Sequence, residues 1–389
     1  MERRQIIAVY MTGFFSLSAL QMVALATPLW GQHLGLSVFM IGLASAARSV
    51  SPFVYALHFG ALMDSIGARR FLIAFSAQCA VVPLLYPLLP FPVAFLLLQL
   101  VLGLAAATAW LGAQTAIARI AAGNSQLTGR FSFFTSAGTV AGPLVLGFAW
   151  ERFGPVGGFC ALGAWGAALL AASILLPARK NVVRRPIDFG ILLPDWRNYA
   201  NGLRALKRPL VAFVIVCAFI RLAAVSTLDS FYPVFLQTLG FSAAAIGALF
   251  AIGNLVSSPS ALLAAWGERM CGTAQRALSV SVATLVVALA VLPALESFWV
   301  IAFWIGVYGF GLGISMPLML SLLSGGVSPE LQGSVAGLRA TANRFAAFIL
   351  PLIMGALAES LGLGGAFMAI SGALLVLVLV ADLRLNARR

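Results

Sequence analysis

The sequence predicts an all-α polytopic membrane protein with twelve transmembrane helices in two pseudo-symmetric halves of six. Hydrophobic residues make up 61% of the 389 residues and charged residues only 9%, whereas a soluble domain carries about 25% charged residues. This excess of apolar side chains cannot be hidden in a water-soluble globule, which must cover its surface with polar groups. The apolar residues also fall into long stretches, and the second half of the chain repeats a pattern found in the first.

The first half contains six apolar stretches, each close to the roughly 20 residues that a helix needs to cross the hydrocarbon core. The first follows Met1-Glu2-Arg3-Arg4 and continues too far to be the short apolar region of a signal peptide. The expected spans of this half are 5–30, 36–62, 71–90, 92–118, 131–150 and 157–177.

The second half contains six further stretches, expected at 210–237, 242–266, 275–293, 298–323, 333–359 and 364–383. Between the halves lies a basic segment with eight Lys and Arg residues: Arg179, Lys180, Arg184, Arg185, Arg197, Arg204, Lys207 and Arg208. The expected organisation is therefore an N-terminal half (1–177), a cytoplasmic basic linker (178–209) and a C-terminal half (210–389).

The net charge of +13 is spread over the short gaps between apolar stretches. Lys and Arg concentrate in alternate gaps, which the positive-inside rule places in the cytoplasm. We therefore expect a monomeric protein of the bacterial cytoplasmic (inner) membrane with both termini cytoplasmic, which contacts lipid and binds no nucleic acid. The four cysteines form no C-x-x-C pair, so we expect neither a metal site nor a cofactor.

An internal repeat relates the two halves at a shift of 208 positions. Residues 143–159 read PLVLGFAWERFGPVGGF, and residues 351–367 read PLIMGALAESLGLGGAF. The coinciding pairs include Pro143/Pro351, Gly147/Gly355, Glu151/Glu359, Gly154/Gly362, Gly157/Gly365 and Phe159/Phe367. Two homologous six-helix halves are the plan of one large class of secondary transporters, in which substrate binds between the halves near the midplane.

Residues 60–70, GALMDSIGARR, follow the second span. They resemble the loop signature of the major facilitator superfamily through Gly60, Leu62, Asp64, Gly67, Arg69 and Arg70, whereas Ser65 stands where the family usually has Arg. The resemblance implies a gating role for this loop. Asp64 can accept N–H bonds at the start of a helix of the other half, helped by the positive end of that helix dipole.

Residues 129–147, GRFSFFTSAGTVAGPLVLG, resemble the fifth-span motif of the antiporter branch of that superfamily. Gly129, Gly138, Gly142, Pro143 and Gly147 match, and Leu146 replaces one Gly. Small residues four apart flatten a helix face for close packing, and Pro143 permits a bend, so we assign Gly138, Gly142, Pro143 and Gly147 to gating. The resemblance implies export in exchange for protons. Span four, however, has Gln99 where the family usually has an Arg implicated in proton transfer, so we expect a different proton path.

Three arginines lie near the middle of expected spans: Arg48, Arg221 and Arg344. An ionisable group inside a membrane is costly unless it is paired or hydrated, and Arg binds carboxylate or phosphate bidentately. We therefore predict a substrate site for an anion, with structural bonds to helix carbonyls as the alternative. Arg339 lies closer to the cytoplasm and is expected at a gate or a lipid headgroup. The further predicted substrate-site residues are Gln21, Gln114, Asn254, Trp304, Tyr308 and Asn343.

Asp229 is the only acidic residue away from the last two positions of an expected span, which makes it the candidate for proton coupling, with an outer-gate hydrogen-bond acceptor as the alternative. Two histidines and no H-E-x-x-H or nucleotide-binding loop argue against an enzyme. The sequence therefore predicts a secondary active transporter that works by alternating access. The preferred function is proton-coupled efflux of a small organic compound, an anionic one favoured. The alternative is a proton-linked importer of an organic anion such as a carboxylate or siderophore.

Overall fold

The computed structural model describes residues 3–66, 68–121, 124–177, 204, 206–326 and 329–386. Within these residues the regular structure is entirely helical, with no strand. The chain forms two compact units, Met1–Pro194 with Gly240–Ala251 and Asp195–Leu239 with Ile252–Arg389. The predicted all-helical membrane architecture is confirmed, since eight helices of the described residues are long and apolar enough to cross a membrane. The number of twelve spans stays a prediction.

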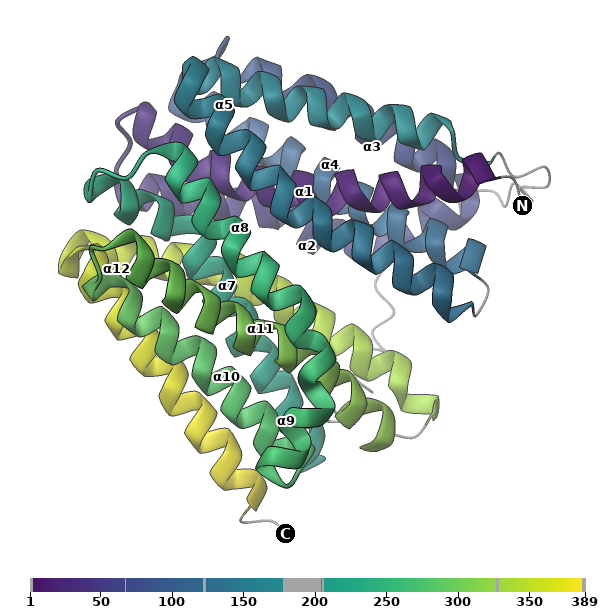
Figure 1. The fold of residues 1–389 in the computed structure, drawn as a ribbon, viewed down its shortest axis with the longest axis vertical. Coiled ribbons are helices and arrows are strands. Elements are labelled where there is room, and N and C mark those ends of the chain that lie inside the picture. Colours follow the sequence, from purple (N-terminus) through teal and green to yellow (C-terminus); the bar gives the residue numbers. More distant parts are fainter. Residues whose placement is uncertain are drawn as a thin grey trace. The chain divides into compact units, whose positions relative to one another are not determined.

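The first unit contains five long helices and the beginning of a sixth, shown from purple to blue-teal in Figure 1. Asn124 caps the fifth helix, because its side-chain oxygen accepts hydrogen bonds from the backbone N–H groups of Gln126 (3.0 Å) and Leu127 (3.1 Å). The helices are α1 (Arg3–His33), α2 (Val38–Ile66), α3 (Ala68–Leu85), α4 (Pro92–Ala121), α5 (Ser125–Ile174) and the first part of α8 (Ala243–Ser260).

The second unit comprises α7 (Pro209–Thr238), which precedes α8 in the chain, and everything from the later part of α8 to the C-terminal end of the described chain. Its remaining helices are α9 (Ala264–Cys271), α10 (Ala274–Val291), α11 (Phe298–Gly326) and α12 (Pro329–Asn386). The expected span 242–266 is interrupted, because α8 ends at Ser260 and a 3₁₀ turn (Ala261–Leu263) precedes α9. Pro259, one residue before this end, has no N–H to continue the helical hydrogen bonds.

Two of the helices, α5 and α12, each contain a sharp internal break at a glycine. The break in α5 lies at Gly154 (φ 68°, ψ −169°), and that in α12 lies at Gly362 (φ 72°, ψ 165°). Figure 1 shows the chain turning back at both places, so that each forms a helical hairpin. Residues that carry a Cβ atom rarely adopt such positive φ values, and this favours glycine at both breaks. The two glycines are a pair of the internal repeat, so the repeat extends to the backbone conformation.

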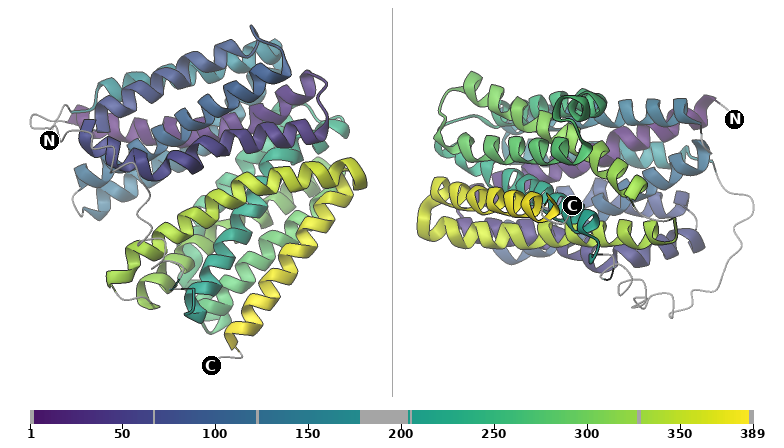
Figure 2. Two further views of the ribbon diagram at one scale, coloured as in Figure 1. Left: turned by 180° about the vertical axis from the view of Figure 1, so that it is seen from behind. Right: turned by 90° about the horizontal axis from the view of Figure 1, so that it is seen from below.

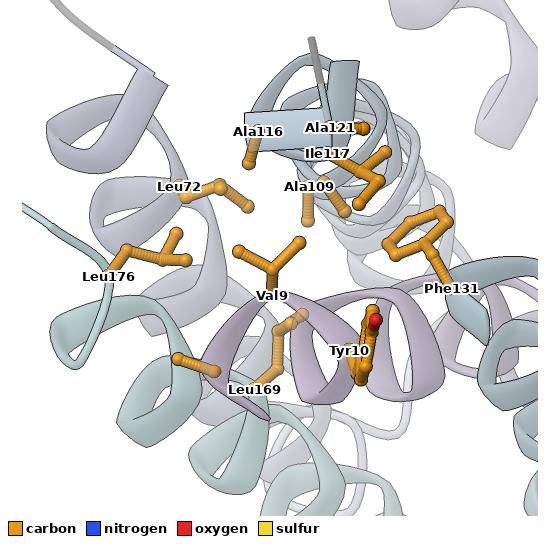
Figure 3. Packing of buried hydrophobic residues seen from close by; sticks show 12 residues of the cluster. Val9, Tyr10, Leu72, Ala109, Ala116, Ile117, Ala121, Phe131, Leu169 and Leu176 are labelled. Atoms are coloured by element: carbon orange, nitrogen blue, oxygen red, sulfur yellow. The ribbon is translucent and has the colours of Figure 1, made fainter. Parts of the chain in front are cut away.

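The core of the first unit is an apolar cluster where α1, α3, α4 and α5 meet. In Figure 3, Val9 of α1 points toward Leu72 of α3 and Ala109 of α4, and Tyr10 lies on the side of Phe131. Phe131 and Leu169 of α5 complete the cluster from either side. The small side chains of Ala109 and Ala113 allow α4 to approach its neighbours closely.

The central helix of the second unit is α7, which packs against α12, α10 and α11. Figure 2 shows this unit from behind, with α12 lying along α7. In both units, buried hydroxyl groups bond to carbonyls one turn earlier in their own helix, as Thr27 does to Val23 (2.7 Å) and Thr227 to Ala223 (2.9 Å). Such bonds satisfy a polar group where water is absent.

Candidate functional site

Arg221 of α7, in the second unit, forms one hydrogen bond within the described chain, and its partner is the uncharged side chain of Ser315. Its Nε donates a hydrogen bond of 3.1 Å to Oγ of Ser315 on α11. Ser315 is fully buried and donates its own proton to the carbonyl oxygen of Leu312 at 2.8 Å, which leaves a lone pair for the arginine. Among the described residues, Arg221 forms no ion pair, and its two terminal nitrogens form no hydrogen bond. Its remaining donors are therefore available to a ligand.

Three further polar groups of the same unit are Tyr308 of α11 and Arg339 and Asn343 of α12. Nη1 of Arg339 contacts Sδ of Met316, a weak acceptor, at 3.8 Å. In the described part of the chain, the Tyr308 hydroxyl, Arg339 Nε and Asn343 Oδ1 are buried without a hydrogen-bond partner. Buried polar atoms in proteins are normally hydrogen-bonded, so these groups are suited to receive a polar ligand.

We call Arg221, Tyr308, Ser315, Arg339 and Asn343 the polar cluster of the second unit. Helical spacing explains why the sequence gathers them. Tyr308 and Ser315 are seven residues apart and share one face of α11, and Arg339 and Asn343 are four apart and share one face of α12. The helix α7 packs against both of these helices and brings Arg221 to them.

Asp229 lies two turns beyond Arg221 on α7 and is partly buried. The two residues form no ion pair with each other. Asp229 acts electrostatically on Tyr308, whereas the groups that act on Arg221 are Tyr308 and Arg339. The phenol of Tyr308, 3% exposed, is therefore within electrostatic range of both the predicted proton carrier and the predicted anion ligand.

In the first unit, Arg48 of α2 lies against Gly103 of α4. A Cβ atom added at Gly103 would collide with the Arg48 carbonyl oxygen and with its side-chain Cγ. One turn earlier on α4, Gln99 is 2% exposed and donates a hydrogen bond of 3.0 Å to Thr27 on α1. Tyr86, which is also buried, lies within electrostatic range of Arg48. The neutral side-chain amide of Gln99 thus occupies the position where the resembled motif has a charged Arg.

The other predicted substrate residues are spread over both units. Gln21 on α1 is partly buried and Gln114 on α4 is exposed, both in the first unit. Asn254 on α8, Trp304 on α11 and Arg344 on α12 are partly buried in the second unit. Of the nine predicted substrate residues, Arg221 and Tyr308 lie within electrostatic range of each other, and Asn343 lies one turn from Arg339 on α12.

Two groups at the cluster were not in the predicted substrate set. Ser315, the anchor of Arg221, could have been found from its spacing of two turns from Tyr308 on the same face. Arg339 was assigned to a gate or a headgroup, because its position along α12 is closer to the cytoplasmic end. Its contact with Met316 has no signal in the sequence, since a methionine in an apolar span does not stand out.

Three glycines of the fifth-span motif, Gly138, Gly142 and Gly147, lie at close helix contacts, whereas a Cβ at Gly129 would meet no atom within 4 Å. A Cβ at Gly138 would collide with the Phe14 carbonyl oxygen of α1, and one at Gly142 would lie 3.0 Å from Cβ of Ser18. Gly147 instead faces the Ala243 carbonyl oxygen at the start of α8. In return, Gly247 of α8 faces the carbonyl oxygen of Pro143.

The start of α8 is also bound to α5 through a carboxylate. Oε2 of Glu151 accepts a hydrogen bond of 3.0 Å from the backbone N–H of Ala244. The next N–H, of Ala245, bonds to the side chain of Ser242 at 3.3 Å. An anion at a helix N-terminus is stabilised both by free N–H groups and by the helix dipole. Sequence reasoning did not single out Glu151 for this role.

The loop signature after α2 is described only in part. Gly60, Asp64 and Gly67 lie outside the residues whose side chains the structure describes, so the expected contact of Asp64 stays a prediction. Arg69 donates to the carbonyl oxygen of Ile174, the last residue of α5, from Nε (3.3 Å) and Nη2 (2.7 Å). A cation at a helix C-terminus is favourable. Arg70 is exposed.

Comparison with known proteins agrees with this architecture. The model of the Major Facilitator Superfamily matches residues 9–351. The fold is similar to that of nucleoside transporter NupG, with 13% identity, a TM-score of 0.79 and 98% of each chain covered. It is also similar to a bacterial homolog of the human lysosomal transporter Spinster, with 14% identity, a TM-score of 0.74 and coverage of 99% of this chain and 97% of the other.

A third solved structure, the human organic anion transporter MFSD10 (TETRAN), is 19% identical, with a TM-score of 0.64 and 99% of each chain covered. At these low identities, the similarities show the fold alone. No curated protein sequence gives a significant match.

Proposed function

The chain belongs to the major facilitator superfamily, a family of secondary transporters and not of enzymes, and we propose that it exports a small organic anion in exchange for protons. In this proposal the protein works by alternating access in the bacterial cytoplasmic membrane, as a monomer with both termini in the cytoplasm.

The observation that carries the proposal is the state of Arg221. A guanidinium in a membrane-spanning helix is costly unless an opposite charge or water compensates it. Within the described residues, Arg221 has one hydrogen bond to neutral Ser315 and no carboxylate partner. A bound carboxylate would supply the missing charge and accept two parallel hydrogen bonds from the terminal nitrogens.

Export and proton exchange are supported by two other features. Gly138, Gly142 and Gly147 of the fifth-span motif, which resembles the antiporter branch, lie at close contacts with α1 and α8. Asp229 supplies a titratable carboxyl group within electrostatic range of Tyr308 and hence beside the polar cluster. In this scheme, protonation of Asp229 and occupation of Arg221 by the anion alternate during the cycle.

Among the structural neighbours, MFSD10 is an organic anion transporter, which agrees with the anionic substrate that we propose. NupG is a nucleoside transporter, so the shared fold does not by itself select a substrate class. The choice of an anion rests on Arg221.

The direction of transport is tested with everted membrane vesicles from cells that produce the protein, energised so that the lumen becomes acidic. An exporter that exchanges substrate for protons accumulates labelled organic anions in these vesicles, and accumulation collapses when nigericin dissipates the pH gradient. Vesicles from cells with an empty vector provide the background. Lack of accumulation of every anion in the panel would contradict export.

Two substitutions test the assigned residues in the same vesicles. We expect Arg221→Gln to reduce anion uptake at least tenfold, since a lost hydrogen bond to a charged group is worth about 1.5–3 kcal/mol. Arg269→Gln removes an exposed arginine of α9 and is the matched control, expected to leave uptake unchanged. Normal uptake by the Arg221→Gln variant would remove this residue from the substrate site.

Proton coupling is tested by Asp229→Asn, which keeps the size and shape of the side chain but cannot titrate. We expect accumulation driven by the pH gradient to be lost, while exchange of labelled for unlabelled anion across the membrane persists. Unchanged dependence of uptake on the pH gradient would show that another group carries the proton.

The second candidate function is proton-linked import of an organic anion such as a carboxylate or siderophore. It is favoured by Gln99, which is hydrogen-bonded to Thr27 and cannot titrate where the antiporter motif has Arg. Right-side-out vesicles placed in acidic medium distinguish the two functions, because only an importer accumulates the anion there.

A further inference from the structure

The polar cluster of the second unit contains two arginines, one more than a monoanionic ligand requires. Arg221 donates to Ser315, and Arg339 contacts the next residue, Met316. The guanidinium groups therefore approach α11 at adjacent positions, although they come from α7 and α12. Their anchors, a hydroxyl and a thioether, are both uncharged, so neither arginine is neutralised by its anchor.

The two positive charges act on each other, since Arg339 is among the groups with an electrostatic effect on Arg221. Like charges repel more strongly in a low-dielectric environment than in water. Within the described residues, neither arginine has an ion-pair partner. The acid nearest in sequence, Asp229, acts on Tyr308 and is not among the groups that act on Arg221.

The remaining unsatisfied atoms of the cluster show what kind of ligand fits. The Tyr308 hydroxyl and Arg339 Nε are donors without an acceptor. They add to the terminal N–H groups of Arg221, so donors are in excess of acceptors. Asn343 contributes an unpaired acceptor, Oδ1, which suits a hydroxyl or N–H on the organic part of the ligand.

We propose that the polar cluster binds a doubly charged anionic group, such as a phosphonate, a phosphate ester or a dicarboxylate, held between Arg221 and Arg339. This inference rests on the proposed transport of an organic anion and specifies its charge. A monoanion leaves one guanidinium uncompensated in the apolar interior, whereas a dianion neutralises both. Arg339 then binds the substrate directly, in addition to any contact it makes nearer the cytoplasm.

The test measures equilibrium binding to the purified full-length protein in detergent, at mildly alkaline pH. Phenylphosphonate is a dianion there, and its monomethyl ester and benzenesulfonate are monoanions of nearly the same shape. We expect phenylphosphonate to bind roughly ten- to a hundredfold more tightly than either monoanion, as one further charge-assisted contact warrants.

Variants assign the preference to the second arginine. Arg339→Gln should reduce phenylphosphonate affinity to that of benzenesulfonate, while benzenesulfonate affinity changes little. Arg339→Lys keeps the charge and should restore part of the preference. Arg221→Gln should weaken all three probes, and Arg269→Gln should weaken none.

A second measurement needs no ligand. If the two guanidinium groups repel each other, the Arg339→Gln variant without ligand should melt at a higher temperature than the unmodified protein. Phenylphosphonate should then raise the melting temperature of the unmodified protein by more than it raises that of the variant at the same concentration. This readout also shows whether the variant is folded.

The inference is overturned by equal affinity for the dianion and the monoanions, by a preference that survives Arg339→Gln, or by the binding of no probe at all. Equal affinity would leave the proposed export of organic anions intact. Conversely, failure of anion uptake in everted vesicles with a retained charge preference in binding would contradict the proposed transport and not the dianion site.

Discussion

At the scale of single residues, one polar contact from each unit can be compared. The contact in the first unit joins two neutral side chains, and the contact in the second unit involves an arginine. Gln99 in the first unit donates a hydrogen bond from Nε2 to a hydroxyl of a neighbouring helix, and both partners are neutral, while its Oε1 is buried without a partner in the described chain. Arg221 in the second unit is anchored at one nitrogen only. Ligand-dependent chemistry is therefore expected first in the second unit, where Arg221 and Arg339 form no ion pair among the described residues.

Gly103 provides a test of the contact between α2 and α4. Replacing it with Ala places a methyl group against the carbonyl oxygen of Arg48, a backbone atom that cannot rotate away. We expect the free energy of unfolding to fall by about 1–3 kcal/mol, as in other overpacked cores. Thermal melting of the purified protein measures this effect.

The control for this substitution is Gly129→Ala on α5, where a new Cβ meets no atom within 4 Å. Ala favours a helix over Gly, so this variant should melt at the same or a higher temperature. Equal melting temperatures for the two variants would show that Arg48 does not press against Gly103.

At the scale of elements, the sequence was sufficient for the all-helical class, but not for every helix end or for how the helices meet. The gap between the expected spans 131–150 and 157–177 contains Gly154, where the structure breaks α5, because hydropathy and the repeat both indicated a turn there. The end of α8 at Ser260 was not predicted, since residues 261–266 remain apolar and hydropathy does not register the missing N–H of Pro259.

The same limit applies to the candidate site. The sequence identified Arg221, Tyr308 and Asn343 because polar groups in apolar spans are conspicuous. Which of them meet depends on the rotation and axial offset of packed helices, which hydropathy does not determine. For this reason Arg339 was assigned by its depth alone, and its neighbour Met316 was not considered.

The contact between α5 and α8 is tested by Glu151→Gln, which keeps an acceptor for Ala244 N–H but removes the charge at the start of α8. Because this carboxylate is exposed, we expect only a small decrease in melting temperature. The decrease should shrink at high salt, where surface charge interactions are screened.

The internal repeat supplies the control for this experiment. Glu359 corresponds to Glu151, is exposed, and forms no hydrogen bond within the described chain. Glu359→Gln should therefore leave the melting temperature unchanged at any salt concentration. An equal decrease in both variants would mean that the bond to Ala244 contributes nothing.

At the scale of the whole molecule, the repeat reaches from sequence to conformation. Gly154 and Gly362 lie 208 positions apart and have nearly the same φ and ψ angles. Both halves therefore join their last two helices by the same glycine turn. This agreement supports the predicted duplication, in which halves 1–177 and 210–389 are homologous.

The predicted orientation of the molecule is tested by reporter fusions. Green fluorescent protein fused after Arg389 should fluoresce, because it folds in the cytoplasm, and alkaline phosphatase at the same place should be inactive. A fusion after Glu296, in a loop expected on the opposite side, is the control and should show the reverse. An active phosphatase at the C-terminus would invert the topology assigned from the Lys and Arg distribution.

The serine that anchors Arg221 has a consequence for how selective the transporter can be. Ser315 donates its hydroxyl hydrogen bond to the carbonyl oxygen of Leu312, so its lone pair faces the guanidinium in one direction. This direction fixes the plane in which the arginine presents its donors. Replacing Ser315 with Ala would free the guanidinium to tilt and to follow differently shaped headgroups. Loss of this one hydroxyl is thus a short evolutionary route from a narrow substrate range to a promiscuous one.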